Sequence, residues 1–288
     1  MHNSYLLIVV VTYKRPNDVL KLIESLQYQR NCELKIIVID TSVSQEDSFF
    51  LEKRIQKNES LMYIVASSNL GYAKGNNFGV RKAVKVWGEP LFVIISNDDI
   101  EITDNYLLHD LSSLMLNNIF IDCLQPKINM TNGFIQGPYN KANIYIESLQ
   151  YLFPFYWYIN RFIKQYKLHN IKKLTKFYRI MGAFFIIKYK TFEEVGMFDE
   201  ATFLGREEDI LAGKLNKARY KTFYYPLKIV KHLQLSKEIQ CVDSFNDSDL
   251  YYWLHIEKVN IFSLKFYLFS KYVFNNLYAK FFKFKIKK

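Results

Sequence analysis

The chain has 288 residues, half of them hydrophobic, with only 10 glycines and 6 prolines. This composition is typical of a packed globular protein, one large domain or a domain with an appendage, and it excludes a disordered chain. The three cysteines are far apart and form no C-x-x-C spacing, which argues against a disulfide framework or a zinc knuckle and fits a reducing cytosol.

The net charge of +11 is unevenly distributed. Residues 141–180 hold eight Lys or Arg and one acid, residues 258–288 hold eight Lys and no acid, and the remainder has a net charge of −4. Both basic segments are also rich in Phe and Tyr. A nucleic-acid-binding protein would normally place cations around its central cleft, so the acidic remainder argues against that class.

In residues 1–130, short apolar runs alternate with amphipathic stretches. Four runs rich in Val and Ile predict buried strands, namely Leu6–Val11, Lys35–Ile39, Met62–Ala66 and Leu91–Ile95. Three stretches between them have apolar residues at helical spacing, namely Asn17–Gln29, Gln45–Lys57 and Lys74–Trp87. This alternation predicts an α/β fold with a parallel, doubly wound sheet and right-handed crossovers.

Polar residues or glycines follow each of these four strands. They are Thr12–Pro16, Asp40–Ser42, Ser67–Gly79 and Asn97–Asp99. Any one of these groups alone is typical of an ordinary turn. Because ligands bind beyond the carboxyl ends of the strands in such sheets, the four groups together predict a site at that edge.

Adjacent carboxylates, Asp98 and Asp99, end the fourth group. Carboxylate oxygens suit Mg²⁺ or Mn²⁺, which commonly carry the phosphates of a substrate, although such a pair also occurs in loops and helix caps. In the third group, Gly71 and Gly75 would allow a ligand to approach the backbone, or they belong to an Asn/Gly turn that leads into a helix. Asp40 either accepts hydrogen bonds from a nucleoside or caps the next helix.

Residues 181–232 are predicted to resume ordered structure. Strands are expected at residues 180–187 and 221–225, and a helix that runs to Lys217 begins after the acidic trio Glu207–Asp209. The helix dipole favours acids in a first turn, but three adjacent carboxylates also repel, which raises the pKa of at least one and suits a general base. His232 is a metal ligand, a phosphate partner or a half-buried side chain.

These motifs together resemble glycosyltransferase family 2, and more narrowly its bacterial rhamnosyltransferase-like branch. The matching segments occur in family order over about residues 5–235: Val11–Pro16, Val38–Ser42, Asn69–Gly79, Ser96–Asp99, Met181–Phe185, Val195–Glu200, Glu207–Asp209 and His232. The resemblance implies a GT-A fold, which is Rossmann-like with a mostly parallel sheet. It also implies inverting, metal-dependent sugar transfer from a nucleotide-sugar.

The resemblance further implies a role for each matching residue. The nucleoside would be held by Thr12, Tyr13, Arg15 and Asp40, with Asp40 reading a uracil or thymine. The diphosphate and sugar would be flanked by Asn69, Gly71, Lys74, Gly75, Asn76, Asn97 and Asp98. The cation, Mg²⁺ or Mn²⁺, would be held mainly by Asp99 with an added contact from His232.

One carboxylate of the acidic trio would be the catalytic base. The family often has Glu-Asp-x-Asp here, and an ungapped match places Glu208 at the base position, whereas a shift by one residue places Asp209 there; Glu207 is the third candidate. We favour Glu208. Lys214 and Arg219 stand where the family usually has Arg and Gly, so the contacts to the acceptor are expected to differ.

The predicted domain organisation follows from these segments. Residues 1–240 would form the catalytic domain, with a nucleotide-binding half (1–130) and an acceptor half (131–240) that contains the basic aromatic insertion 141–180. Residues 241–288 would form a basic amphipathic helical tail. The tail either binds an anionic membrane surface or packs on the domain, and the insertion either contacts a lipid-linked glycan or is a plain helical insertion.

We therefore expect an enzyme that moves a sugar from a UDP- or dTDP-sugar to a growing bacterial surface polysaccharide, such as a capsule or O-antigen. The absence of a signal-like N-terminus and of a long apolar span predicts a cytoplasmic protein, or one peripheral on the inner face of the cell membrane. Three rivals remain: a nucleotidyltransferase, which would release pyrophosphate; a basic nucleic-acid-binding protein; and an inactive relative that binds sugar nucleotides without turnover.

Overall fold

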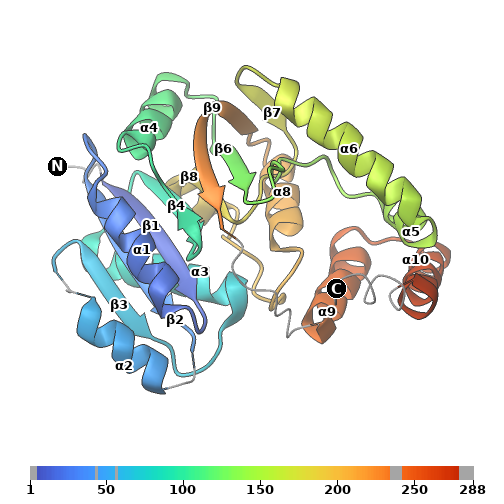
Figure 1. Ribbon diagram of the computed structural model, residues 1–288, viewed down its shortest axis with the longest axis horizontal. Coiled ribbons are helices and arrows are strands. Elements are labelled where there is room, and N and C mark those ends of the chain that lie inside the picture. Colours follow the sequence, from blue (N-terminus) through green and yellow to red (C-terminus); the bar gives the residue numbers. More distant parts are fainter. Residues whose placement is uncertain (1–4, 43–44, 56–57, 234–241, 279–288) are drawn as a thin grey trace. The chain divides into compact units, whose positions relative to one another are not determined.

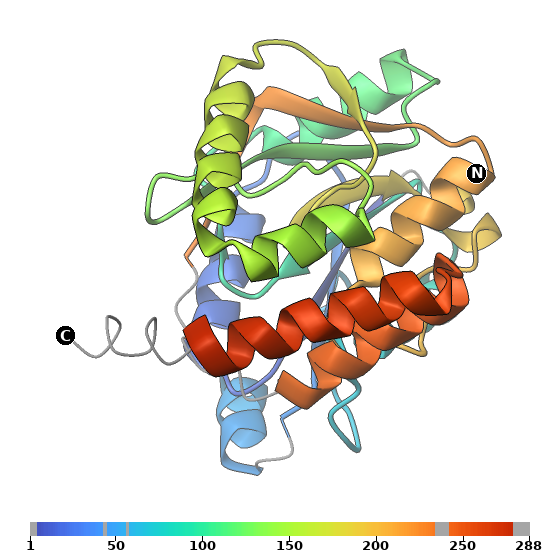
Figure 2. The same cartoon turned by 90° about the vertical axis from the view of Figure 1, so that its right-hand side faces the viewer.

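The computed structural model describes residues 5–42, 45–55, 58–233 and 242–278. The chain divides into two compact units, shown from two sides in Figures 1 and 2. The first comprises the described residues of Met1–Asn140 and Lys172–Ser248, and the second those of Lys141–Ile171 and Asp249–Lys288. The site residues expected from the sequence all belong to the first unit.

A mixed sheet forms the centre of the first unit. Over the described residues it has nine strands in the order β3-β2-β1-β4-β8-β6-β9-β5, and β7 also pairs with β9. The strands are β1 (Leu6–Thr12), β2 (Leu34–Asp40), β3 (Leu61–Val65), β4 (Phe92–Asn97), β5 (Ile100–Glu101), β6 (Cys123–Met130), β7 (Thr175–Phe177), β8 (Phe184–Lys188) and β9 (Thr222–His232). The first four strands are parallel to one another, as are β6 and β9, so the sheet is mostly parallel as predicted.

Helices cover both faces of this sheet (Figure 1). They are α1 (Pro16–Gln27), α2 (Gln45–Arg54), α3 (Gly71–Trp87), α4 (Leu107–Asn117), α7 (Tyr189–Glu194) and α8 (Glu207–Lys217), and α9 (Val242–Tyr251) follows. Alternate residues of β1 face opposite sides, since Ile8 packs in one hydrophobic cluster with α1 and α4 and Val9 in the other with α3 and α8. Burial on both faces explains the continuous Val/Ile runs of these strands.

The predicted strands and helices of residues 1–130 are present. Strand β6 and helix α4 also lie in this region. The strand expected at residues 221–225 does not end at Pro226 but continues to His232, because the pairing of β6 with β9 shifts from Tyr225 directly to Ile229. Pro226 lies in this bulge, where no ladder hydrogen bond is required of it.

The second unit is helical and joins the insertion to the C-terminal region. It contains α5 (Ile144–Leu152), α6 (Pro154–Asn170) and α10 (Ile261–Val273), with π-helical turns at Tyr252–Ile256 and Phe274–Tyr278. Helix α10 packs against α5, where Tyr145 Oη lies 2.6 Å from Ser263 Oγ and the ring of Tyr151 contacts that of Tyr267. The last lysines of the expected tail, in residues 279–288, lie outside the described residues.

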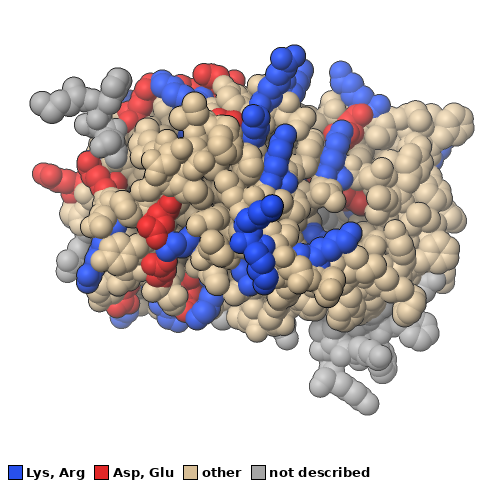
Figure 3. All heavy atoms as spheres, turned by 90° about the horizontal axis from the view of Figure 1, so that it is seen from above, with Lys and Arg blue, Asp and Glu red and all other residues tan. Residues whose placement is uncertain are grey.

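Charge on the surface is uneven, as the sequence indicates. Figure 3 shows Lys and Arg side chains together in the middle of one face, whereas Asp and Glu gather toward its left side. Among the described helices, none is both long enough and apolar enough to cross a bilayer.

Candidate active site

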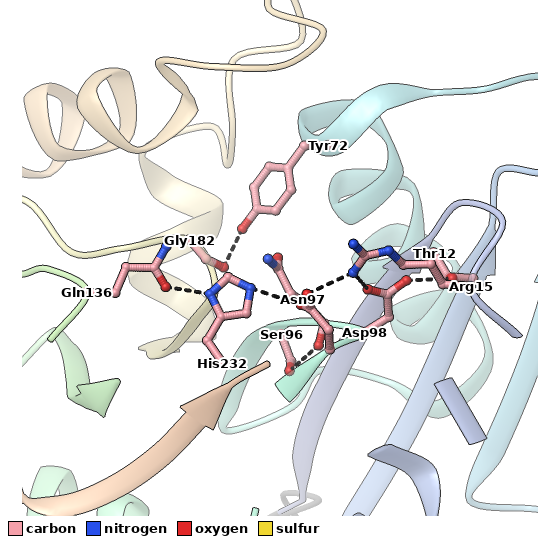
Figure 4. Close-up of polar contacts among 10 residues, drawn as sticks. Thr12, Arg15, Tyr72, Ser96, Asn97, Asp98, Gln136, Gly182 and His232 are labelled. Carbon is pink, nitrogen blue, oxygen red and sulfur yellow. Dashed lines mark hydrogen bonds and ion pairs between the residues drawn. The ribbon is translucent and has the colours of Figure 1, made fainter. Parts of the chain in front are cut away.

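The carboxyl ends of β1 and β4 bring Thr12 and Asp98 together. The two strands are parallel neighbours, so the residues that follow them leave the sheet at the same edge. Thr12 Oγ1 donates a hydrogen bond to Asp98 Oδ2 over 2.7 Å. Arg15, between β1 and α1, places Nη1 2.8 Å from Asp99 Oδ2 and 3.4 Å from Asp98 Oδ1, as Figure 4 shows for Asp98.

Strand β9 supplies the opposite side of this cluster. Its last residue, His232, pairs with Ile100 of β5, and its Nε2 lies 2.9 Å from Asp99 Oδ1. Burial opposes ionisation of Asp99, but the neighbouring His232 and Arg15 outweigh burial and lower the pKa of its carboxyl to about 2. Asp99 is therefore ionised at neutral pH.

The adjacent Asp98 has the opposite shift. Burial raises the pKa of its carboxyl to about 7, and the charge of Asp99 adds to the effect, whereas the hydrogen bond from Thr12 and the charge of Arg15 oppose it. The pKa values of the adjacent Asp98 and Asp99 are thus shifted in opposite directions, because only Asp99 faces two basic groups, Arg15 and His232.

The other ring nitrogen of His232 contacts a residue that the sequence did not single out. Nδ1 lies 2.5 Å from the side-chain oxygen of Gln136, which follows β6 (Figure 4). An amide oxygen accepts but cannot donate, so the hydrogen bond assigns a proton to Nδ1. No motif surrounds Gln136 in the sequence, and only the fold brings it to His232.

The Asp99–His232 contact fits a divalent cation. Asp99 Oδ1 is buried and lies 2.9 Å from His232 Nε2. The two atoms are close enough that both would bind one ion. A carboxylate oxygen with an imidazole nitrogen is a donor pair that Mn²⁺ accepts.

In the part of the chain that the structure describes, no group of three His, Cys, Asp or Glu side chains is placed to hold a metal. Asn97 lies between His232 and Arg15 in Figure 4. Cations that bind with a nucleotide usually also take phosphate oxygens and water as ligands.

A second group of polar residues meets around Gly182, just before β8. Its N–H donates to Glu208 Oε1 over 3.0 Å, and its carbonyl accepts a hydrogen bond from Tyr72 Oη over 2.7 Å (Figure 4). The next carbonyl, of Ala183, accepts the N–H of Asn97 over 2.9 Å. This short segment thus links Glu208 of α8 to the end of β4.

A side chain at position 182 would disturb these contacts. A Cβ atom there would lie 2.5 Å from Glu208 Oε1 and 2.6 Å from Tyr72 Oη, closer than real Cβ contacts allow. Any side chain would therefore displace Glu208, Tyr72 or the segment itself. This close packing explains why the segment Met181–Phe185 contains a glycine.

The three acids at the start of α8 have different surroundings. Glu207 and Asp209 are buried, whereas Glu208 is half-buried. Asp209 Oδ2 pairs with Arg179 at 2.5 Å and with Arg206 at 3.4 Å. Burial raises the pKa of Glu207 to about 8, with the charge of Glu208 as the next cause. Glu208 is the carboxylate that a substrate reaches most readily.

The raised pKa of Glu207 predicts a pH-dependent stability. An acid whose pKa rises on folding contributes stability that is present below its ordinary pKa and is lost as pH rises through the folded value, here about 8. We expect Glu207→Gln, which mimics the protonated acid, to raise the melting temperature relative to wild type at pH 9 by about 5 °C more than at pH 5. Thermal melts at both pH values measure this. Glu24→Gln, at an exposed acid of α1, is the control, and an equal difference at both pH values would contradict the assignment.

Asp40 and Thr12 lie side by side, as partners in the pairing of β2 with β1. The Asp40 side chain is fully buried, and it accepts hydrogen bonds from the N–H of Ser42 over 2.8 Å and from Tyr63 Oη over 2.6 Å. Tyr13, by contrast, is exposed. The residues expected to hold a nucleoside therefore share one edge of the sheet, although they differ in accessibility.

The segment that begins α3 is held by contacts within the protein. Asn69 Oδ1 accepts the N–H of Gly71 over 3.1 Å, and the side chain of Asn76 donates to the carbonyl of Tyr72 over 2.9 Å. A Cβ on Gly75 would lie 2.9 Å from the side chain of Val11. Close packing of α3 on β1 thus accounts for Gly75, and its approach to a ligand stays a prediction.

Gly71 and Lys74 complete this segment. Gly71 has a φ of +70°, and a Cβ there would lie 2.4 Å from the carbonyl oxygen of Phe203, so glycine is required both by conformation and by space. Lys74 is exposed. Asn76 Oδ1 is buried without a hydrogen bond in the described part of the chain.

A mostly parallel sheet that carries adjacent carboxylates at the end of β4, with an antiparallel β8 beside it, has the GT-A architecture of glycosyltransferases. The chain belongs to glycosyl transferase family 2, whose family model matches residues 7–196. Enzymes of this family bind a nucleotide-sugar donor and an acceptor. No curated protein matches the chain.

Solved structures show the same fold. GalNAc-T7, solved with UDP, GalNAc and Mn²⁺, is similar with a TM-score of 0.63 and 16% identity over 97% of this chain and 57% of its own. S. aureus TarS is similar with a TM-score of 0.54 and 16% identity over 95% of this chain and 44% of its own. The chain thus spans about half the length of these two proteins, and at this identity the likeness concerns the fold.

Proposed function

We propose that the protein is an inverting, metal-dependent glycosyltransferase of the rhamnosyltransferase-like branch. It transfers a sugar from a UDP- or dTDP-sugar to a growing bacterial surface polysaccharide, such as a capsule or O-antigen. The observation that supports this most directly is the pair of Asp99 Oδ1 and His232 Nε2, 2.9 Å apart at the sheet edge. Through Asn97 and Ala183 this edge connects to the segment that holds Glu208.

The donor would lie along the carboxyl ends of β1, β2 and β4. Its nucleoside would contact Thr12, Tyr13, Arg15 and Asp40. Asp40 would read uracil or thymine by exchanging one of its present hydrogen bonds for an N–H of the base. The diphosphate and sugar would contact Asn69, Gly71, Lys74, Gly75, Asn76, Asn97 and Asp98.

Asp99 and His232 would hold Mg²⁺ or Mn²⁺. When bound, the cation supplies positive charge opposite the diphosphate that leaves the sugar. Arg15 contributes a second, permanent positive charge at the same place, since its Nη1 contacts Asp99 Oδ2. The protein thus stabilises the negative charge that develops as the bond from the anomeric carbon to the diphosphate breaks.

Glu208 would act as the catalytic base. Its Oε1 is oriented by the N–H of Gly182, which keeps the carboxylate in place while it accepts the proton of an acceptor hydroxyl. The hydroxyl attacks the anomeric carbon from the face opposite the diphosphate, so a single displacement inverts the configuration. Asp209, paired with Arg179 and Arg206, supports the start of α8 instead.

A panel of nucleotide-sugars tests this proposal. With Mn²⁺ present, the true donor at a hundredfold its Kd stabilises the fold by about 2.7 kcal/mol, which raises the melting temperature by about 5–10 °C. With an acceptor added, free UDP or dTDP is the expected product. Release of pyrophosphate would identify a nucleotidyltransferase instead, and stabilisation without turnover on any glycan acceptor would identify an inactive relative.

The proposed location is the cytoplasm, at the inner face of the cell membrane. Helix α6 supports this location, because Leu168 is the single buried side chain of this fully described helix. Phe155, Ile159, Phe162 and Tyr166 recur every three or four residues, so they form one stripe, and they are 42% to 76% exposed. We call these four residues the aromatic stripe.

The remaining composition of α6 fits a lipid surface. The helix contains Arg161, Lys164 and Lys167 and no acid, and each basic residue near an anionic bilayer contributes about 1 kcal/mol. Tyr and Trp prefer the interface between headgroups and acyl chains. An acceptor attached to a lipid would then be presented to the enzyme at the surface that α6 binds.

We expect the triple variant Phe155→Ser, Phe162→Ser, Tyr166→Ser to bind anionic vesicles at least about tenfold more weakly, since each aromatic side chain loses apolar burial of about 1–2 kcal/mol. Co-sedimentation with phosphatidylglycerol vesicles measures the binding. The control is Ile119→Ser, which removes an 84% exposed apolar side chain from the first unit. Unchanged sedimentation of the triple variant would contradict a role for the stripe.

A further inference from the structure

Gln136 is held rigidly beside His232 by its backbone. Its N–H donates to the carbonyl of Ile128 in β6 over 2.9 Å, and its own carbonyl accepts a hydrogen bond from the side chain of Gln125 over 3.1 Å. The side-chain oxygen of Gln136 then lies 2.5 Å from His232 Nδ1. Because both its N–H and its carbonyl are hydrogen-bonded, Gln136 is suited to orient the ring of His232.

The contact decides which nitrogen of His232 is available. A neutral imidazole carries one proton, and a partner that can only accept places this proton on Nδ1. The lone pair is then on Nε2, which faces Asp99 Oδ1 at 2.9 Å. Two acceptors at this distance repel unless a positive charge lies between them or the ring takes up a second proton. A divalent cation would supply this positive charge.

We infer that Gln136 is a positioning residue that keeps His232 in the Nδ1–H tautomer and so presents Nε2 to a divalent cation. This inference rests on the proposed metal dependence of the enzyme. Histidines that bind metals commonly donate their second ring N–H to such a partner, and loss of the partner lowers metal affinity about 10- to 100-fold.

A second glutamine extends the network toward Glu208. Gln125, in β6, is fully buried; its side-chain N–H₂ holds the carbonyl of Gln136, and its Oε1 accepts the N–H of Met181 over 2.7 Å. Met181 precedes Gly182, whose N–H holds Glu208. One buried side chain therefore ties the loop that orients His232 to the segment that orients Glu208.

The tautomer of His232 tests the inference without any metal. We expect long-range ¹H–¹⁵N spectra of the metal-free protein to show a proton on Nδ1, with the resonance assigned by its loss in His232→Asn. Gln136→Leu should move the proton to Nε2, where Asp99 accepts it. Gln136→Glu keeps an acceptor and should retain the Nδ1 proton. The control, Gln27→Leu, alters an exposed glutamine of α1 and should change nothing.

Metal affinity gives the second readout. Titration with MnCl₂, followed by the electron paramagnetic resonance of free Mn²⁺ with and without UDP, should show about 10- to 100-fold weaker binding by Gln136→Leu. Gln136→Glu and Gln27→Leu should bind like wild type. If Gln136→Leu fails to fold, Gln136→Met replaces it as the longer, unbranched variant that also lacks an acceptor.

The outcomes separate the inference from the proposed function. An unchanged Nδ1–H tautomer in the apolar variant would overturn the role of Gln136, as would an unchanged Mn²⁺ affinity when the wild type binds the ion. Failure of the wild type to bind Mn²⁺, with or without UDP, would instead overturn the metal dependence, and the spectra would still decide whether Gln136 sets the tautomer.

Discussion

Replacement of Asp99 by Asn is expected to lower sugar transfer by about 10³-fold, a loss of about 4 kcal/mol of transition-state stabilisation. The change keeps the shape of the side chain but removes a charge that is present at neutral pH, because the pKa of Asp99 is about 2. Arg15 loses its ionic partner, and His232 loses the carboxylate beside its Nε2. A cation at this edge would lose its only carboxylate ligand among the expected site residues.

Turnover at saturating donor and Mn²⁺, together with thermal melts, measures this prediction. The matched control is Asp122→Asn, because Asp122 is also largely buried and pairs with Lys188 over 3.0 Å, away from the expected site residues. The control should lose comparable stability and retain transfer. Near-normal turnover by Asp99→Asn would remove the central support for the proposed cation site.

Replacement of Glu208 by Gln is expected to lower kcat by about 10³-fold and to leave the affinity for the donor unchanged. The amide still accepts the N–H of Gly182, so the geometry around Gly182 persists while the proton acceptor is lost. Initial rates with varied donor and acceptor, combined with donor-induced stabilisation, separate kcat from binding.

The neighbouring acids serve as controls for this assignment. Glu207→Gln should retain transfer, since Glu207 is buried and favours its protonated form at neutral pH. Asp209→Asn should mainly lower stability, because Arg179 and Arg206 would lose their charged partner. A large loss of kcat in Asp209→Asn with a nearly active Glu208→Gln would shift the base by one residue.

Much of the sheet is predictable because its buried parallel strands consist of runs of Val and Ile. The same pattern predicts that Thr12, Asp40 and Asp99 end neighbouring strands, and pairing confirms that Thr12 and Asp40 are partners. What the sequence does not predict is which of three consecutive acids in α8 is accessible, since a rotation of one residue around a helix exchanges buried and exposed sides.

Local sequence patterns also fail to predict the residues that support the site. Tyr72 and Gly182 are 110 residues apart, Gln136 and His232 are 96 apart, and Gln125 and Met181 are 56 apart. No periodicity or motif marks such pairs, because each depends on where two distant strands end. The sequence does not predict the continuation of β9 past Pro226 for the same reason, since a bulge set by pairing with β6 accommodates the proline.

The second, helical unit is built from two separate segments of the chain, one internal and one C-terminal to the residues of the first unit. The chain passes between the two units after Asn140, after Ile171 and again after Ser248. Removal of the C-terminal region alone would remove the contact of α10 with α5 and expose Tyr145 and Tyr151 to solvent. A clean excision therefore needs three cuts, after positions 140, 171 and 248, and one new junction between positions 140 and 172, and grafting the unit onto a related enzyme would need three splices.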